Sequence, residues 1–203
     1  MKAVRIHRHG NSSVLQCDDI AQPICKKDKV ILEVKSASIN HLDIWVRGGL
    51  PGLSIPLPLI MGSDASGVIT EVGQDVSEFK VGDAVVVQPG VFCGECEFCI
   101  SGKENYCYYY GVLGETKNGV QADYVSLAPE NIHIKANHLS FEEAASMPLV
   151  FMTAYQMLIE RAKLQASETV LVYGGSSGVG SAAIQIAKDA GAIVIATIGI
   201  QTI

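Results

Sequence analysis

Val170–Thr197 reads VLVYGGSSGVGSAAIQIAKDAGAIVIAT and holds the clearest structural signal in the chain. A short apolar run, Val170–Tyr173, leads into a glycine-rich turn, and a helical stretch of about Val179–Ala190 follows it. Gly191 is a stop signal for that helix, and Ile193–Thr197 has the pattern of a second strand. This order predicts a strand–helix–strand unit, the element from which parallel sheets are built.

The glycine-rich turn is Gly174-Gly175-Ser176-Ser177-Gly178-Val179-Gly180. Glycine lets a backbone approach a pyrophosphate, and the start of the helix offers unpaired N–H groups with a partial positive charge. The spacing from Gly175 is G-x-x-G-x-G rather than G-x-G-x-x-G, but the flanking strands and helix supply the expected context. We therefore predict that these seven residues bind a dinucleotide. An ordinary strand–helix turn is the alternative.

The end of the second strand bears on the choice of cofactor. NAD enzymes usually carry Asp or Glu there, about 20 residues after the motif, to bond the ribose 2′-hydroxyl. Ile198-Gly199-Ile200 contains no acid. The sequence thus favours NADP over NAD, although no Arg or Lys for a 2′-phosphate follows before the last residue.

The first 135 residues are rich in predicted strands. Val30–Ser36 alternates between two faces, the period-2 pattern of a half-buried strand. Apolar runs bounded by turn residues predict further strands at Ser66–Val72, Ala84–Gln88 and Val120–Leu127. Short strands at such spacing favour a small barrel or sandwich. One helix is expected among them, with Asn40 as its N-cap and Gly48-Gly49 as its stop.

The pattern changes near residue 140. Ser140 and Glu143 form a capping-box motif, and Pro148 suits the first turn of a longer helix through about Leu164. We therefore expect an α/β protein with a domain boundary near residues 130–150. Residues 1–140 form a β-rich domain, and residues 141–203 form the first strand–helix–strand part of a parallel sheet.

Four of the six cysteines cluster near residues 90–110, at Cys93, Cys96, Cys99 and Cys107. Their C-x2-C-x2-C-x7-C spacing suits tetrahedral zinc, and four protein ligands leave no open position, so this zinc would be structural. An iron–sulfur cluster is the main rival, but the bacterial ferredoxin run needs a gap of three and a following Pro. Four unligated thiols remain the other alternative. The two separate cysteines, Cys17 and Cys25, are expected to be free thiols.

Composition excludes several classes of protein. The formal charge of −6 and the absence of a basic run argue against a nucleic-acid-binding surface. Met1–Gly10 has no apolar segment of signal-peptide length, and no run approaches the roughly 20 apolar residues of a membrane-spanning helix. We therefore expect a cytoplasmic protein, in a compartment where clustered cysteines hold metal more often than disulfides.

Taken together, these motifs resemble the medium-chain dehydrogenase/reductase family, which includes zinc alcohol dehydrogenases and quinone oxidoreductases. The likeness runs from Met1 to about Thr197. It is carried by the cysteine cluster, the glycine-rich turn and three further stretches: Ala37–Asp43, Met61–Val68 and Thr153-Ala154-Tyr155. The resemblance implies a GroES-like β-domain followed by a Rossmann domain, with a small-molecule substrate in the cleft between them and a possible homo-oligomer.

Three departures from the family matter. The catalytic zinc of alcohol dehydrogenases is held by Cys, a His-Glu pair and Cys, where this chain has Asn40, Ser63-Asp64 and Leu149. Asn, Ser and Leu are poor or impossible zinc ligands, so no catalytic zinc is expected, although His41 and Asp64 could seed an atypical site. The other two departures lie at the end of the chain. Only two of about six Rossmann strands are expected, and the last four residues do not fit the family. A truncated gene, a frameshift or deliberate shortening would each explain this.

The resemblance also implies roles for single residues. His41 falls where the family contacts the cofactor pyrophosphate, and Thr153 where it touches the nicotinamide; a surface histidine and a core helix residue are the alternatives. Asn40 would lie by the nicotinamide or the substrate carbonyl. Asp43 would organise the catalytic cleft or simply complement the helix dipole. Trp45 is expected to pack rather than react.

The function expected of the parent enzyme is hydride transfer between NADP(H) and a quinone, enone or related carbonyl compound. Without a zinc Lewis acid, reduction of an already activated conjugated system is easier to account for. The alternatives are a zinc-dependent alcohol dehydrogenase with atypical ligands, and a non-catalytic, zinc-stabilised GroES-like module. The 203-residue chain alone is expected to bind cofactor weakly and to show little or no activity.

Overall fold

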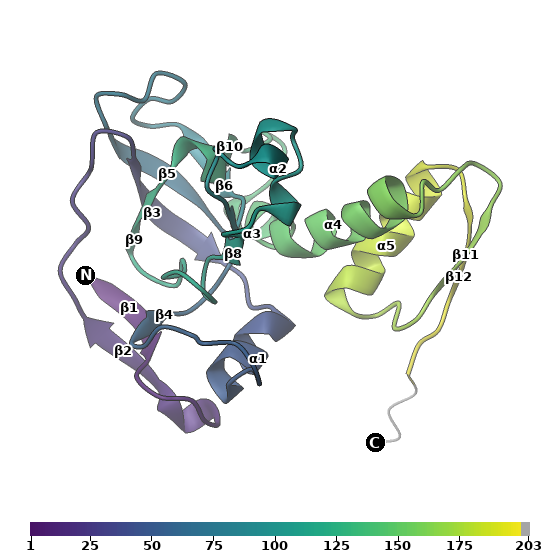
Figure 1. The fold of residues 1–203 in the computed structure, drawn as a ribbon, viewed down its shortest axis with the longest axis horizontal. Coiled ribbons are helices and arrows are strands. Elements are labelled where there is room, and N and C mark those ends of the chain that lie inside the picture. The colour runs from purple at the N-terminus through teal and green to yellow at the C-terminus, as the bar shows by residue number, and fades with distance from the viewer. Residues whose placement is uncertain (200–203) are drawn as a thin grey trace. The chain divides into compact units, whose positions relative to one another are not determined.

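A computed structural model describes residues 1–199, and the chain divides into two compact units, Met1–Pro148 and Leu149 to the C-terminus. The first unit is built mainly from antiparallel strands, and in the second a helix connects two parallel strands (Figure 1). The expected α/β fold, a β-rich domain followed by the start of a parallel sheet, is confirmed.

Antiparallel sheets make up the first unit. The largest has five strands in the order β10-β6-β5-β3-β9, a second has the order β2-β1-β4, and β7 pairs with β8. The strands are β1 (Lys2–Ile6), β2 (Leu15–Asp19), β3 (Val30–Ala37), β4 (Leu59–Ile60), β5 (Ala65–Val72), β6 (Ala84–Val87), β7 (Gly90–Val91), β8 (Gly111–Val112), β9 (Tyr124–Leu127) and β10 (Ile132–Ile134).

Two apolar clusters stabilise this unit. The first lies on the five-stranded sheet and includes Val30, Leu32, Ile69, Val85 and Val87, all fully buried. The second joins helix α1 (His41–Gly48) to β1 and β4 through Ile6, Val46, Leu59 and Met61. Packing in this second cluster holds α1 against β1 and β4 of the three-stranded sheet, which fixes the position of the helix N-terminus.

The remaining helices of the first unit are short. Helix α2 (Glu97–Ile100) lies within the cysteine cluster, and α3 (Phe141–Ala145) contacts β3 and β5. Single helical turns occur at Ser12–Val14, Glu104–Tyr106 and Pro129–Asn131. The capping box of α3 is formed as predicted: the Glu143 N–H donates to Ser140 Oγ at 3.1 Å, and the Ser140 N–H donates to Glu143 Oε2 at 2.8 Å.

The second unit contains the strand–helix–strand element expected from the sequence. Helix α4 (Pro148–Tyr155) continues as π-helical turns over Gln156–Arg161, and β11 (Thr169–Val172), α5 (Gly178–Asp189) and β12 (Ile193–Ala196) follow. β11 and β12 pair in parallel, with Val170 opposite Val194. Val170, Val172 and Val194 pack with Ala182 and Ala183 of α5, which joins sheet and helix into one core.

Several expected boundaries differ from the structure. Val120–Asp123 lies outside β9, because its backbone bonds to β1 and to Met61-Gly62 instead. The α-helix expected through Leu164 changes to π-helical bonding after Tyr155. The expected alternation of buried and exposed side chains is absent at the start of β3, where Val30, Ile31 and Leu32 are all buried. The register between β3 and β5 shifts at the same place. The division between the two units falls after Pro148, within the expected range of residues 130–150 but later than residue 140, since α3 packs on strands of the first unit.

Among residues 1–199, no helix combines the length and the apolar character that crossing a membrane requires. Residues 200–203 lie outside the described part of the chain. The sequence-based predictions about Ile200 and the last four residues therefore stay predictions.

Candidate functional site

The glycine-rich turn connects the C-terminal end of β11 to the N-terminus of α5. Gly174 has φ of 70°, a left-handed conformation that side chains with a Cβ rarely adopt. Its N–H donates to Thr197 Oγ1 at 3.0 Å, and the Gly175 N–H donates to the Thr197 carbonyl at 2.8 Å. The turn is therefore tied to the end of the neighbouring parallel strand. The sequence analysis did not identify Thr197 as part of this turn. A signal was available, because the carboxyl ends of parallel strands lie at the same edge of a sheet.

The start of α5 approaches the turn so closely that only glycine fits at position 180. A Cβ on Gly180 would lie 2.2 Å from the Gly174 carbonyl oxygen. Ser177 is the N-cap, and its Oγ accepts the Gly180 N–H at 3.0 Å. The Gly178 and Val179 amides belong to the first helical turn, where intrahelical bonding offers them no acceptor. These two N–H groups, beside the exposed Ser176, are the ones that suit an anionic ligand.

The side chains of the four clustered cysteines bring their sulfur atoms close together. Their sulfur atoms all lie within 4.8 Å of one another. Cys93 Sγ is 3.9 Å from Cys99 Sγ and 3.6 Å from Cys107 Sγ, and Cys96 Sγ is 3.5 Å from Cys99 Sγ. Four sulfurs around zinc at about 2.3 Å are separated by about 3.8 Å. The donor set therefore fits a tetrahedral thiolate-bound metal ion.

Backbone amides surround these sulfurs. The Cys93 N–H lies 3.3 Å from Cys107 Sγ, and the Tyr109 N–H also lies 3.3 Å from that sulfur. The Cys99 amide lowers the pKa of Cys96 to about 6, whereas burial raises the pKa of Cys99 to about 12. A nearby cation would hold the buried Cys99 as a thiolate near neutral pH, because a buried thiolate without one is costly. The cysteine cluster thus has the chemistry of a closed metal site.

A second polar cluster lies at the N-terminal end of α1. Asn40 is 8% exposed and Asp64 is fully buried. Asn40 Nδ2 donates to Asp64 Oδ2 at 2.9 Å, and Ser38 Oγ lies 3.5 Å from the same oxygen. The amide nitrogen of Asn40, rather than its amide oxygen, thus faces the Asp64 carboxyl group. Sequence reasoning missed the pairing of these two residues.

At two of the positions that the resemblance assigns to catalytic zinc, Ser63 and Asp64, the side chains form hydrogen bonds within the first unit. Ser63 Oγ donates to the Leu113 carbonyl at 2.8 Å, and Asp64 faces the Asn40 amide. Among the described residues, the four cysteines are the group of three or more His, Cys, Asp or Glu whose ligand atoms come together. Because the Asn amide and the Ser hydroxyl are poor zinc ligands, Asn40 and Ser63 do not fit a catalytic zinc, and the atypical site at His41 and Asp64 stays a prediction.

Asp43 uses its carboxylate to hold backbone rather than substrate. Asp43 Oδ2 accepts the Asn40 N–H at 2.7 Å, and Asp43 Oδ1 accepts the Gly62 N–H at 3.1 Å. Burial raises the pKa of Asp43, and the two backbone amides oppose that effect. These contacts join the start of α1 to the turn before β5. They support a positioning role for Asp43, and its catalytic role stays a prediction.

The raised pKa of Asp43 gives a pH-dependent prediction. A buried acid that binds its proton more tightly when folded stabilises the protein below its unfolded pKa of about 3.9 and loses that contribution as the pH rises through the folded value. The unfolding free energy of the wild type should thus fall relative to Asp43→Asn as the pH rises from about 4. Urea titrations at several pH values measure this. A wild-type advantage over Asp43→Asn that grows with pH would contradict the assignment.

The two remaining predicted cofactor contacts, His41 and Thr153, are exposed side chains. The His41 ring meets the Trp45 ring edge to face, with centroids 4.8 Å apart and planes at 64°. Thr153 Oγ1 donates to the Leu149 carbonyl at 2.7 Å, an ordinary bond along its own helix. Their cofactor roles stay predictions. Trp45, expected to pack, keeps 52% of its surface exposed.

The sequence of this chain is similar to those of known proteins. The alcohol dehydrogenase GroES-like domain family matches residues 26–137. The quinone oxidoreductase of Homo sapiens is 33% identical over 202 residues, which cover 99% of this chain and 54% of that protein. The chain thus spans about half the length of the curated relatives it matches.

Solved structures give the same result at the level of the fold. An NAD-dependent alcohol dehydrogenase superposes with a TM-score of 0.95 at 45% identity, over 99% of this chain and 59% of the other. A cobalt- and zinc-bound thermostable alcohol dehydrogenase from Pyrobaculum aerophilum has a TM-score of 0.88 at 32% identity, over 97% of this chain and 59% of the other. The similarity therefore extends over both units.

Proposed function

Because the chain belongs to the medium-chain dehydrogenase/reductase family and carries its alcohol dehydrogenase GroES-like domain, we propose that it is part of a hydride-transferring oxidoreductase. The proposed reaction passes a hydride between NADP(H) and a quinone, an enone or a related carbonyl compound. The observation that carries this proposal is the pairing of Asn40 with Asp64 where alcohol dehydrogenases bind catalytic zinc. A site without that Lewis acid is best suited to a substrate that is already activated by conjugation.

The residues of the chain have distinct tasks in this proposal. The Gly178 and Val179 amides at the start of α5 bind the diphosphate of the dinucleotide, which supplies the hydride when it is bound. Asn40 donates an N–H to the substrate carbonyl, since Nδ2 has two hydrogens and Asp64 accepts only one. Asp64 orients that amide, and Asp43 holds the segment in place through backbone amides.

The cysteine cluster is proposed to hold one structural zinc ion. Its sulfur separations match a tetrahedral ZnS4 site, and four thiolates leave no position for substrate. A relative in cobalt- and zinc-bound form supports metal binding in this family. A thiolate-bound zinc of this kind suits a reducing compartment, so we also propose a cytoplasmic location.

A second candidate is an NAD-dependent alcohol dehydrogenase with atypical ligands. It is favoured by the 45% identity to a structure of that activity. Metal analysis separates the two candidates: one zinc per chain supports the zinc-independent reaction, whereas two zinc ions together with alcohol oxidation would transfer the assignment to an alcohol dehydrogenase.

Dinucleotide binding is the direct test of the proposed function. Titration of the 203-residue chain with NADPH and with NADH, followed by cofactor fluorescence, is expected to show weak saturable binding that favours NADPH. Binding is expected to be weak because the chain spans only about half the length of its curated relatives. Absence of saturation with either cofactor would instead support a non-catalytic, zinc-stabilised module. Steady-state turnover by the chain alone would contradict the expectation that this part has little activity.

A further inference from the structure

The first unit contains a cavity of about 400 Å³, named here the Asn131 cavity. One side of its wall is Gly90–Gly94, which leads from β7 into the cysteine cluster, and another is the end of β9 with the turn after it. Leu113 and Leu127 are buried in the wall and Phe92 is half-buried, so part of the lining is apolar. No residue of this wall has a task in the proposed hydride transfer.

Asn131 lines the cavity although it is only 7% exposed. Its Nδ2 donates to the Gln88 carbonyl at 2.9 Å and to the Gly90 carbonyl at 2.7 Å. Because a carbonyl oxygen can only accept, these two bonds use both amide hydrogens and assign the opposite atom of the amide as Oδ1. The backbone N–H and carbonyl of Asn131 are also used, in bonds with Ala128 and Gln88.

The amide oxygen of Asn131 is the polar atom that these bonds leave over. Within residues 1–199, no donor lies within hydrogen-bond distance of Oδ1. This oxygen is not fully enclosed by protein atoms, so it is accessible from the cavity that Asn131 lines. A largely buried acceptor therefore faces a space in which a ligand could supply the missing donor.

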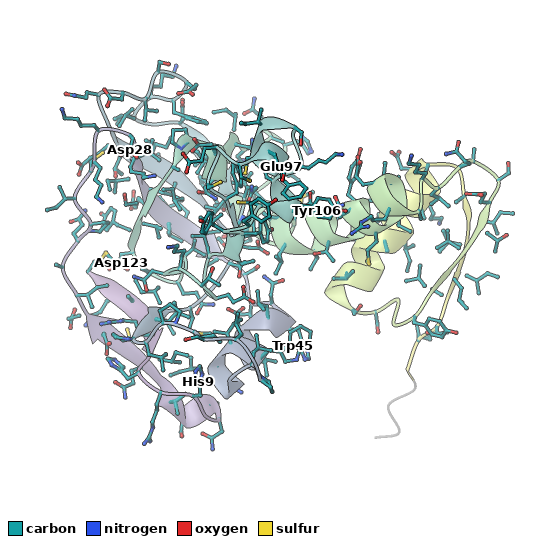
Figure 2. All side chains as sticks on the ribbon, in the orientation of Figure 1. His9, Asp28, Trp45, Glu97, Tyr106 and Asp123 are labelled. Atoms are coloured by element: carbon teal, nitrogen blue, oxygen red, sulfur yellow. The ribbon has the colours of Figure 1, made fainter. Side chains whose placement is uncertain are left out.

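The charged side chains of the cavity wall oppose one another. Lys29 Nζ lies 3.3 Å from Asp28 Oδ2, and Asp28 is labelled in Figure 2 just before β3. The two other charged residues of the wall, Lys117 and Glu130, are exposed and opposite in sign. These pairs leave little net charge to attract an ion, so the cavity is best suited to an uncharged ligand.

We propose that the Asn131 cavity binds a small uncharged molecule that has an apolar body and one N–H or O–H group. The donor group bonds to Asn131 Oδ1, and the apolar body packs against Phe92 and Leu113. A molecule without the donor is rejected, because it displaces water from Oδ1 and leaves that oxygen unpaired. The volume lies within the range of small-molecule sites and suits a compound of one or two rings.

Two isomers test the donor directly. 3-Methylindole and 1-methylindole have the same size, but only 3-methylindole keeps the hydrogen on its ring nitrogen. Equilibrium dialysis against the 203-residue chain is expected to show saturable binding of one 3-methylindole per chain, about tenfold tighter than that of 1-methylindole. Equal affinities for the two isomers, or no saturation with 3-methylindole, would overturn the proposal.

A variant that fills the cavity tests the place of binding. Ala128 is part of the wall, and Ala128→Leu is expected to weaken 3-methylindole binding about tenfold, because the larger side chain occupies ligand space. Ala136→Leu is the matched control, since Ala136 is exposed and lies outside the wall. Equal affinities in these two folded variants would place the ligand elsewhere and contradict the proposal.

Far-ultraviolet circular dichroism checks that each variant is folded. If Ala128→Leu failed to fold, the comparison of the two isomers on the wild type would still decide the proposal. None of these measurements uses a dinucleotide or hydride transfer. Their outcome is therefore independent of the proposed oxidoreductase, which is tested by NADPH binding.

Discussion

Replacing Cys99 by serine is expected to reduce zinc content from about one ion per chain to less than about 0.1 and to lower the melting temperature by on the order of 10 °C. Cys99 is buried, and its sulfur lies 3.5 Å from Cys96 Sγ and 3.9 Å from Cys93 Sγ. A serine hydroxyl does not replace a thiolate ligand. The remaining three sulfurs would then lose the cation that allows their charges to lie so close together.

Metal analysis and thermal circular dichroism measure this effect. Cys17→Ser is the matched control, because Cys17 is exposed and lies far along the chain from the cluster. The control should keep its zinc and its melting temperature. The apolar cluster around Val30, Leu32 and Ile69 contains no cysteine, so the five-stranded sheet should remain folded in Cys99→Ser. One zinc ion per chain in Cys99→Ser would contradict the proposed four-thiolate zinc site.

Gly180→Ala is expected to weaken dinucleotide binding about 10- to 100-fold, or about 1.4 to 2.7 kcal/mol. The added methyl group would lie 2.2 Å from the Gly174 carbonyl oxygen and 2.9 Å from Ser177 Oγ. Since no heavy atoms approach so closely, the start of α5 must move away from the turn. That shift is expected to displace the Gly178 and Val179 amides from the proposed diphosphate site and to destabilise the second unit by about 1–3 kcal/mol.

NADPH titration and urea unfolding of the same sample separate loss of binding from loss of folding. Ser181→Ala is the matched control, because the next residue of α5 is exposed and its change adds no atoms. It should bind NADPH as the wild type does. If Gly180→Ala bound NADPH as tightly as the control while remaining folded, the glycine-rich turn would have no part in cofactor binding.

Local sequence patterns predicted most of the fold that surrounds the candidate site. The strand–helix–strand unit was predicted within a residue or two at each boundary, because apolar periodicity, the Ser177 cap and Gly191 all act over one or two helical turns. The four cysteines were identifiable for a similar reason. Their spacing in one loop limits how far apart the sulfurs can lie.

Predictions that needed distant segments were less successful. Val120–Leu127 was expected to be one strand, but its first half bonds to β1 and to Met61-Gly62, which no local pattern indicates. Trp45 was expected to pack, yet half of it is exposed because α1 turns Val46 toward the core. Both the end of this strand and the exposure of Trp45 depend on packing against segments that are distant in the sequence.

The sequence by itself therefore determined the order of the elements, the clustering of the four cysteines and the glycine-rich turn before a helix, all of which arise from residues close in sequence. Only the tertiary structure decided that Asn40 faces Asp64, that Asp43 holds the Gly62 amide, and that Thr197 closes the glycine turn. These partners are 24, 19 and 23 residues apart. Such contacts depend on strand pairing and helix packing, which fix the distances between segments through the whole core rather than through local backbone preference.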